Sequence, residues 1–367
     1  MRPIIVFLLV FAVSACATVD RMIAPVVPQA AEVAPTERVF FGTTRAPNPD
    51  GALGFGRTSD LRLGVTEISV PPNRMPGQVS NGGATPDPLV DFVIAEEVGF
   101  PSTTAFQRAL RANPGRRILP EREVTVFVHG FNNSFSDSLF RAAQIQYDLE
   151  VPGAMIVYSW PSRGHALGYE YDRDSVQFAR DGLEELLRNV HSSRSGQIVL
   201  VAHSMGAELA METLRQIEKQ EPGWTGRNLS GVMLISPDID IDVFRSQMSQ
   251  IRNVPDPFVI FASRRDRALR LSAGLTGLPS RLGNLTDVAL VADLPVAVVD
   301  VTAFSEGPGL NHFVPASSPA LIAMFQRSEN LDREFLRGQS GTPAPFLGAE
   351  RVIVQNATEI VLRPFAR

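Results

Sequence analysis

Cysteine is nearly absent from this sequence: the chain of 367 residues contains only Cys16. A single thiol cannot form an internal disulfide, so the fold must depend on an apolar core, and 44% of the residues are hydrophobic. An excess of one charge is also lacking, because the net charge is −5 and acidic and basic residues are interspersed without a basic stripe. This excludes the usual signature of a nucleic-acid-binding protein, so we expect no nucleic acid partner. No cluster of metal-binding residues stands out in the sequence, and we expect neither a metal nor a cofactor.

A long hydrophobic run is lacking as well. The apolar stretch Ile4–Val13 is too short to span a bilayer and predicts a signal peptide in residues 1–15. The sequence Val13-Ser-Ala-Cys16 resembles a bacterial lipobox, which predicts cleavage before Cys16 and lipidation of that cysteine. An ordinary signal peptide with a chance cysteine is the alternative. We favour the lipoprotein because small residues and the sole cysteine coincide at the cleavage point. Ala17 is not the aspartate that retains lipoproteins in the inner membrane of many Gram-negative bacteria, so we expect an outer-membrane anchor facing the periplasm.

The chain divides into a short tether, one large domain and a short tail. Residues 16–37 are rich in Ala, Pro and Val without a period, which predicts a flexible tether. Residues 38–335 are predicted to form one α/β domain. Residues 336–367 are predicted to contain a linker, Gly338–Pro345, and a short hairpin, Val352–Gln355 with Glu359–Leu362. The first part of the domain has strand-like runs and one short helix: Val39–Gly42, Leu61–Val70, Val90–Glu96 and the helix Phe106–Ala112.

From Val124 onward, strand-like and helix-like segments alternate. Such alternation predicts right-handed crossovers and a mainly parallel sheet flanked by helices, with the earlier strands as a β-rich N-terminal extension. The predicted segments are the strands Val124–Val128, Met155–Trp160 and Ile198–Val201 and the helices Ser136–Asp148 and Asp172–Val190.

The stretch Gly196–Gly206 carries the clearest chemical signal. Its apolar run ends in Ala202-His-Ser-Met-Gly206, and an amphipathic segment follows at once. Strand, sharp turn with a serine at the apex and then helix is the layout of a nucleophile elbow, which resembles the α/β-hydrolase superfamily. Ser204 is therefore the predicted nucleophile. A buried serine at an ordinary strand–helix junction is the alternative, so the motif needs partners elsewhere.

Partners follow in the chain order of that superfamily, which is nucleophile, acid and then histidine. His312 is the only histidine beyond the elbow, so it is the predicted general base. The predicted acid is Asp266, which follows the second strand after the elbow. Asp238 and Asp240 follow the preceding strand and compete for this role, although they could instead cap a helix.

A strand ending in Val128-His-Gly-Phe-Asn-Asn133 predicts the oxyanion loop. The main-chain N–H groups of Phe131 and Met205 are the predicted donors to the oxyanion. His129 precedes the serine, so we expect it to support the loop and not to act as the base. Phe131, Tyr158 and Trp160 are candidates to line the pocket, although aromatic residues at strand ends are more often core.

Several sequence blocks together resemble a bacterial family of α/β-hydrolases of unknown function, often called DUF900. The resemblance extends from about Arg38 to about Phe335 and implies the triad Ser204, Asp266 and His312 without implying a substrate. The blocks are Phe40-Phe-Gly-Thr-Thr-Arg45-Ala-Pro47, Val128-His-Gly-Phe-Asn-Asn133, Tyr158-Ser-Trp-Pro-Ser162, Ala202-His-Ser-Met-Gly206 and Ser263-Arg-Arg-Asp-Arg-Ala-Leu-Arg-Leu-Ser272.

These observations predict a serine hydrolase that acts through an acyl-enzyme on a small-molecule ester. Amidases, thioesterases and peptidases would use the same residues. The rival interpretation is a catalytically idle envelope lipoprotein that serves as a binding or scaffold module. The segment Leu269–Leu294 could form a partial lid with an apolar wall, or could be ordinary packing.

Overall fold

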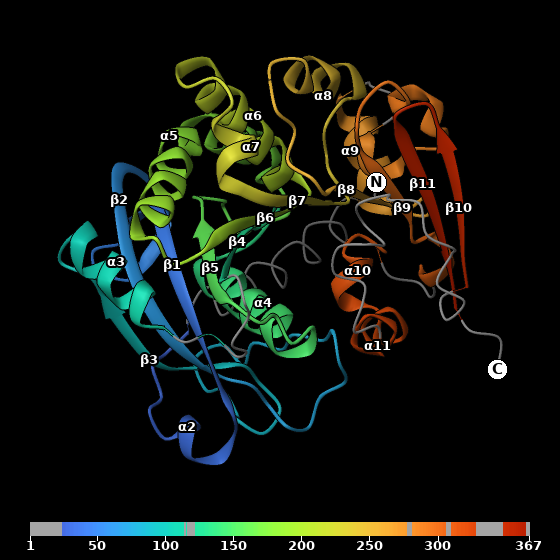
Figure 1. Ribbon diagram of the computed structural model, residues 1–367. Coiled ribbons are helices and arrows are strands. Elements are labelled where there is room, and N and C mark those ends of the chain that lie inside the picture. Colours follow the sequence, from blue (N-terminus) through green and yellow to red (C-terminus); the bar gives the residue numbers. More distant parts are fainter. Residues whose placement is uncertain are drawn as a thin grey trace, which may run out of the picture.

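A single sheet runs through the residues that the computed structural model describes, which are 24–113, 115, 122–276, 281–305, 310–327 and 348–364. Its order is β10-β11-β9-β8-β7-β6-β4-β5-β1-β2-β3 (Figure 1). The predicted signal peptide, Cys16 and the linker Gly338–Pro345 lie outside these residues. The strands are β1 (Thr36–Pro47), β2 (Leu53–Ser69), β3 (Val93–Gly99), β4 (Glu123–Val128), β5 (Ala154–Ser159), β6 (Gln197–His203), β7 (Leu229–Ile235), β8 (Phe258–Ala262), β9 (Ala297–Asp300), β10 (Gly348–Val354) and β11 (Ala357–Arg363).

The centre of the sheet is parallel, from β5 through β4, β6, β7 and β8 to β9. β1 joins this region in parallel to β5, and β2 and β3 extend it in antiparallel pairing. The predicted mainly parallel sheet with a β-rich N-terminal extension is therefore confirmed. Because parallel strands end at the same edge, the loops after β4, β6, β8 and β9 gather there, and these loops carry the predicted site residues.

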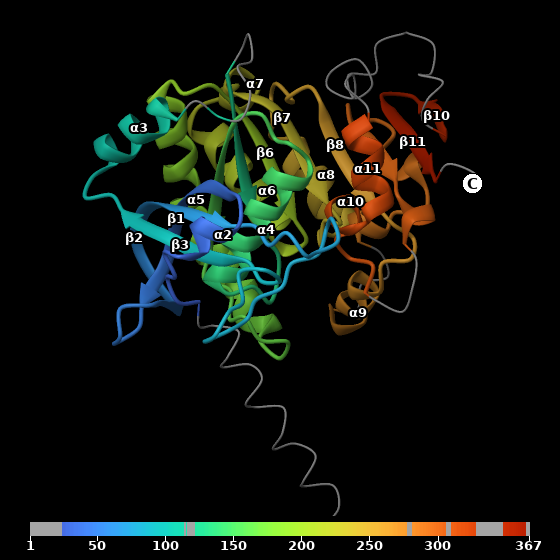
Figure 2. The same cartoon turned by 90° about the horizontal axis from the view of Figure 1, so that it is seen from below.

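Helices cover both faces of the sheet. In Figure 1, α5, α6, α7 and α8 lie above the strands and α4, α10 and α11 lie below. Figure 2, seen from below, shows the second group in front of the sheet. The helices are α2 (Ala30–Val33), α3 (Thr103–Ala112), α4 (Phe135–Asp148), α5 (Tyr169–Ser193), α6 (Met205–Gln220), α7 (Trp224–Asn228), α8 (Ile241–Met248), α9 (Arg267–Thr276), α10 (Val314–Ser317) and α11 (Pro319–Arg327). Among the described residues, no helix is both long enough and apolar enough to cross a bilayer.

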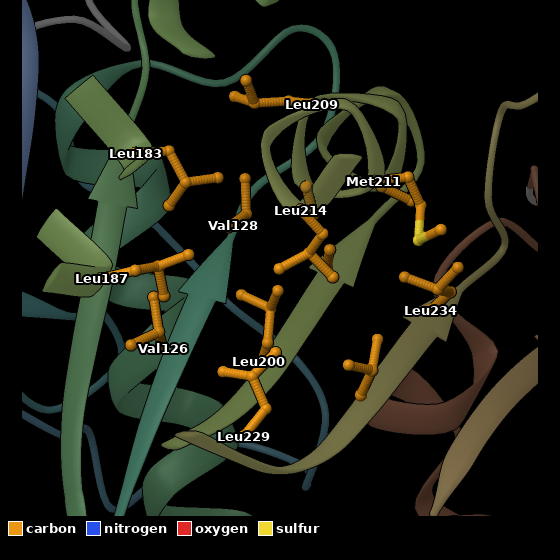
Figure 3. Packing of buried hydrophobic residues seen from close by; sticks show 14 of the residues in the cluster. Val126, Val128, Leu183, Leu187, Leu200, Leu209, Met211, Leu214, Leu229 and Leu234 are labelled. Carbon is orange, nitrogen blue, oxygen red and sulfur yellow. The ribbon is translucent and has the colours of Figure 1, made fainter. Parts of the chain in front are cut away.

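The larger core cluster lies between the sheet and the helices α5 and α6. Val126 and Val128 alternate with Phe127 along β4, so the two valines face this cluster and the phenylalanine faces the other side. Leu183 and Leu187 of α5 pack against the same layer and are fully buried (Figure 3). Burying each such side chain stabilises the folded state by about 1.5–3 kcal/mol. This core anchors the helix on which the nucleophile elbow depends.

The ends of the described chain pack more closely than the sequence suggests. The predicted tether, residues 16–37, already contacts the sheet in its described part: the Val27 N–H donates to the Ile94 carbonyl, and Ala30 is fully buried. At the other end, β10 and β11 form a hairpin, and β11 pairs in parallel with β9. The tail beyond residue 335 therefore contributes strands to the main sheet.

Candidate active site

The turn between β6 and α6 is a strained elbow. Ser204 has φ 53° and ψ −123°, a conformation that L residues rarely adopt and that costs about 1–3 kcal/mol. The turn is tight because α6 packs on the end of β4: a Cβ at Gly206 would lie 2.2 Å from the His129 carbonyl oxygen. Small residues are therefore required at this point, and the strained backbone presents the serine side chain at the sheet edge.

Three predicted residues come together at this edge. Ser204 Oγ lies 2.7 Å from His312 Nε2, and His312 Nδ1 lies 2.8 Å from Asp266 Oδ2. Asp266 is fully buried, and its other carboxylate oxygen accepts a hydrogen bond from the Leu269 N–H at 3.0 Å. His312 follows Asn311, whose left-handed φ of 54° turns the loop after β9. The order is therefore acid, imidazole and hydroxyl, each within hydrogen-bonding distance of the next.

Neither rival acid contacts His312. Asp238 accepts hydrogen bonds from the hydroxyls of Ser272 and Tyr169 and lies 3.2 Å from the Arg281 guanidinium. Asp240 caps α8, where it accepts hydrogen bonds from two main-chain N–H groups at 2.9 and 3.2 Å. Of the three aspartates, Asp266 is thus the one that contacts His312.

His203 is a neighbour of the nucleophile that sequence reasoning did not assign. Its Nε2 lies 3.1 Å from the His312 carbonyl oxygen, and its ring packs against Phe313 with centroids 4.4 Å apart. Burial, reinforced by the nearby His312, holds the pKa of His203 well below its usual value, so the ring is neutral. A neutral ring with its proton on Nε2 donates to that carbonyl and fixes the backbone of His312.

The loop after β4 lies directly against the nucleophile. A Cβ at Gly130 would lie 2.9 Å from the Ser204 Cβ and 2.7 Å from His203 Nδ1. In the described part of the chain, the next main-chain N–H, that of Phe131, has no acceptor. The Met205 N–H is in the first turn of α6, where helix amides have no partner in their own helix. The Met205 N–H thus follows the serine directly, and the Phe131 N–H follows Gly130, which packs against the serine.

The aromatic candidates divide between core and site. Tyr158 and Trp160 are fully buried, so they do not line a pocket. The Trp160 ring stacks on His129 at 4.9 Å, and burial lowers the pKa of His129 to about 3. This neutral histidine contacts the carbonyl oxygens of Gly130 and Trp160, which agrees with a supporting role. Phe131 is partly buried and packs edge-on against Tyr169 with centroids 5.5 Å apart.

The segment predicted as a partial lid forms α9, η1 (Leu282–Asn284) and η2 (Val288–Val291). Its side chains are mixed: Leu269 is buried, whereas Leu271 is 65% exposed. The Ser272 hydroxyl of α9 contacts both Asp238 and Tyr169, so this segment is fastened beside the elbow by polar contacts. In the residues that the structure describes, no group of three or more His, Cys, Asp or Glu side chains is arranged to hold a metal ion.

The parallel sheet and the elbow at its carboxyl edge define an α/β-hydrolase fold. The chain belongs to the DUF900 family, described as alpha/beta hydrolase of unknown function, whose model matches residues 103–328. The resemblance found in the sequence is thereby confirmed, over a shorter range than the predicted Arg38–Phe335. No curated protein matches the chain.

Similar solved structures include three hydrolases. A YdeN-like hydrolase from Pectobacterium atrosepticum is 20% identical, with 49% of this chain and 77% of that chain covered and a TM-score of 0.28. Aspergillus fumigatus lipase B is 14% identical, with 62% and 57% covered and a TM-score of 0.36. Trichoderma reesei cutinase, in complex with a phosphonate inhibitor, is 16% identical, with 56% and 74% covered and a TM-score of 0.24. The fold class rests on the family match and not on these likenesses.

Proposed function

We propose that this α/β hydrolase is a serine carboxylesterase that acts through an acyl-enzyme. One observation carries the proposal: Ser204 Oγ, the His312 ring and the Asp266 carboxylate form a continuous hydrogen-bonded chain with separations of 2.7 and 2.8 Å. A serine hydroxyl is a weak nucleophile at neutral pH, and a base at this distance activates it. The buried Asp266 selects the tautomer with the proton on Nδ1, which leaves Nε2 free to accept the serine proton.

The reaction follows from this arrangement. Ser204 Oγ bonds to the ester carbonyl carbon while its proton moves to His312 Nε2, and the carbonyl oxygen becomes an oxyanion facing the Phe131 and Met205 amides. Collapse of this intermediate breaks the bond to the alcohol oxygen, which takes the proton from His312. Water then attacks the acyl-enzyme with His312 again accepting a proton, and the carboxylic acid leaves with the serine restored.

An ester is the proposed substrate because this fold mostly hydrolyses esters and the site supplies an activated serine. Amides and thioesters would pass through the same steps. The rival function is a binding or scaffold module without catalysis. It predicts that the chemistry of Ser204 is dispensable, whereas the hydrogen-bonded chain above has no evident purpose in a scaffold.

The test uses the full chain in detergent and a fluorophosphonate probe, which phosphonylates activated serines. We expect labelling of the wild type at Ser204 and no labelling of Ser204→Ala, because the nucleophile is gone. His312→Ala should also resist the probe while keeping the wild-type circular dichroism spectrum. A folded wild type that resists the probe would contradict the esterase and favour the scaffold.

We also propose that Cys16 carries a lipid anchor that holds the enzyme in the outer membrane, facing the periplasm. The lipobox-like sequence that ends at Cys16 supports the lipid anchor. Residue 17 is alanine and not aspartate, which supports the outer membrane as the location. A small-molecule ester in the cell envelope would then be within reach of the site.

A further inference from the structure

The oxyanion loop is also held by a buried polar network whose members lie in the sequence blocks given above, although those blocks assigned them no role. Arg45 lies on β1, which precedes the family match, and is fully buried. Its guanidinium donates to Ser159 Oγ at 3.0 Å, to the Ser162 carbonyl at 2.9 Å and to the Asn133 carbonyl at 2.8 Å. A fourth bond, at 3.1 Å, goes to the Gly54 carbonyl. One side chain thus joins β1, the end of β5 and the oxyanion loop.

A buried carboxylate holds the same loop from another side. Asp172 of α5 is fully buried and accepts hydrogen bonds from the Ser162 hydroxyl at 2.5 Å and from the Asn132 N–H at 3.3 Å. The Ser162 hydroxyl oxygen in turn accepts from the Asn133 N–H at 3.2 Å. Burial lowers the pKa of Arg45 to about 10, so it stays charged at neutral pH near Asp172. Buried charges persist only when they are compensated by hydrogen bonds, and here one bond of each group reaches the loop: Arg45 donates to the Asn133 carbonyl and Asp172 accepts from the Asn132 N–H.

The last link is the Asn133 side chain. Its Nδ2 donates to the Gly130 carbonyl at 3.2 Å and to the Phe131 carbonyl at 2.8 Å. The Gly130 carbonyl and the Phe131 N–H belong to the same trans peptide unit, in which C=O and N–H point in opposite directions. Holding the carbonyl on the Asn133 side therefore fixes the direction of the Phe131 N–H on the other side of the peptide.

We propose that Asn133, secured by Arg45, is a positioning residue that aims the Phe131 amide at the oxyanion. Neither residue touches the reacting atoms. Arg45 fixes the Asn133 main chain, the Asn133 amide fixes the Gly130–Phe131 peptide, and that peptide supplies the donor. The strand β1 is thus part of the catalytic apparatus, although it lies outside the residues that define the family match. This inference rests on the proposed esterase function.

The test is steady-state hydrolysis of p-nitrophenyl acetate by the full chain and its variants. Asn133→Asp keeps the shape of the side chain but loses both N–H donors, so the Gly130 carbonyl keeps only its contact with His129 Nδ1 at 2.9 Å and the Phe131 carbonyl loses its bond to Asn133. An oxyanion donor acts in the transition state, so kcat should fall about a hundredfold while KM is unchanged. Arg45→Lys should lower kcat in the same way, because one ammonium cannot reach all the acceptors of the planar guanidinium.

Arg74→Lys is the matched control. Arg74 is a largely buried arginine that makes two hydrogen bonds to Asp148, and neither residue contacts the oxyanion loop. This variant should lose thermal stability and keep the wild-type kcat. If Arg45→Lys does not fold, Asn133→Asp decides, together with Ser162→Ala, which removes the hydroxyl that donates to Asp172 and accepts from the Asn133 N–H and should lower kcat about fivefold.

The outcomes separate the two proposals. If Asn133→Asp keeps the wild-type kcat while the fluorophosphonate still labels Ser204, the positioning role is overturned and the esterase stands. A kcat loss that Arg74→Lys shares equally would also overturn it, because general destabilisation would then be the cause. A wild type that neither hydrolyses the ester nor reacts with the probe would overturn the proposed function and this inference with it.

Discussion

Asp266 Oδ2 lies 2.8 Å from His312 Nδ1, and the carboxylate is shielded completely from solvent. In the proposed mechanism, a carboxylate in this position fixes the tautomer of the imidazole and stabilises the imidazolium that would form when Ser204 loses its proton. The same carboxylate accepts the Leu269 N–H, so its orientation is set by the first turn of α9.

Asp266→Asn should reduce kcat by about four orders of magnitude while leaving the fold intact, because the amide favours the wrong tautomer of His312. The measurement is ester hydrolysis, with circular dichroism to check folding. Asp238→Asn is the control, since Asp238 contacts Ser272, Tyr169 and Arg281 but not His312. Equal losses in the two variants would show that Asp266 has no special role.

Gly130→Ala should lower kcat about a hundredfold, because the new methyl group would meet the Ser204 Cβ at 2.9 Å and displace the oxyanion loop. Gly99→Ala is the matched control: nothing lies within 4 Å of a Cβ at Gly99, which ends β3 far from the elbow in the sheet order. Its stability should change by less than about 0.5 kcal/mol, with activity unchanged. Wild-type activity in Gly130→Ala would mean that the oxyanion loop can move away from Ser204 without a loss of kcat.

The stability of the protein should depend on the protonation of Glu208. Burial raises the pKa of this carboxyl, in the first turn of α6, to about 7 from an ordinary value of 4.5. Between these two values the folded state binds more protons than the unfolded state, so stability falls as pH rises from 4.5 through 7.

Glu208→Gln removes this titration. In thermal unfolding, the melting temperature of the variant relative to that of the wild type should rise as the pH increases from about 4.5 to 8. Below about pH 4.5 this difference should change little. A difference in melting temperature that is the same at every pH would contradict the raised pKa of Glu208.

Cys16→Ala should abolish lipidation and release the protein from the membrane, because the only thiol that can carry the lipid is gone. The measurement is metabolic labelling with an alkyne fatty acid, followed by fractionation of inner membrane, outer membrane and periplasm. Wild-type protein should carry the label in the outer-membrane fraction. An unlabelled wild type in the periplasm would favour the ordinary signal peptide.

Much of the site could be predicted because the order of residues along the chain reflects the order of strands in a parallel sheet. The elbow motif indicates Ser204, and His312 is indicated because it is the only histidine beyond the elbow. Neither inference requires knowledge of how the helices and strands pack. Strand order favours Asp266 as the acid but does not exclude Asp238. Both aspartates follow strands, and only the paths of the loops after β8 and β9 decide which one reaches the histidine.

Arg45 shows where sequence reasoning stops. An arginine near the end of a strand is usually a surface residue, and its spacing from neighbours does not indicate burial. Its partners lie 88 and 117 positions away, at Asn133 and Ser162, so they become visible only when β1 pairs with β5. The same holds for the packed part of the predicted tether, where Ala30 is buried against residues of β2 and β3 that are distant in the chain.

The pairing of β11 with β9 has a consequence for how the protein is made. Residues 357–363 are synthesised after every residue of the site, yet they cover an edge of the strand that leads to His312. A chain interrupted by a premature stop codon before residue 348 would contain the complete triad and still expose the backbone groups of β9. Such an edge recruits other strands, so truncated products should be prone to aggregation and become targets for quality-control proteases.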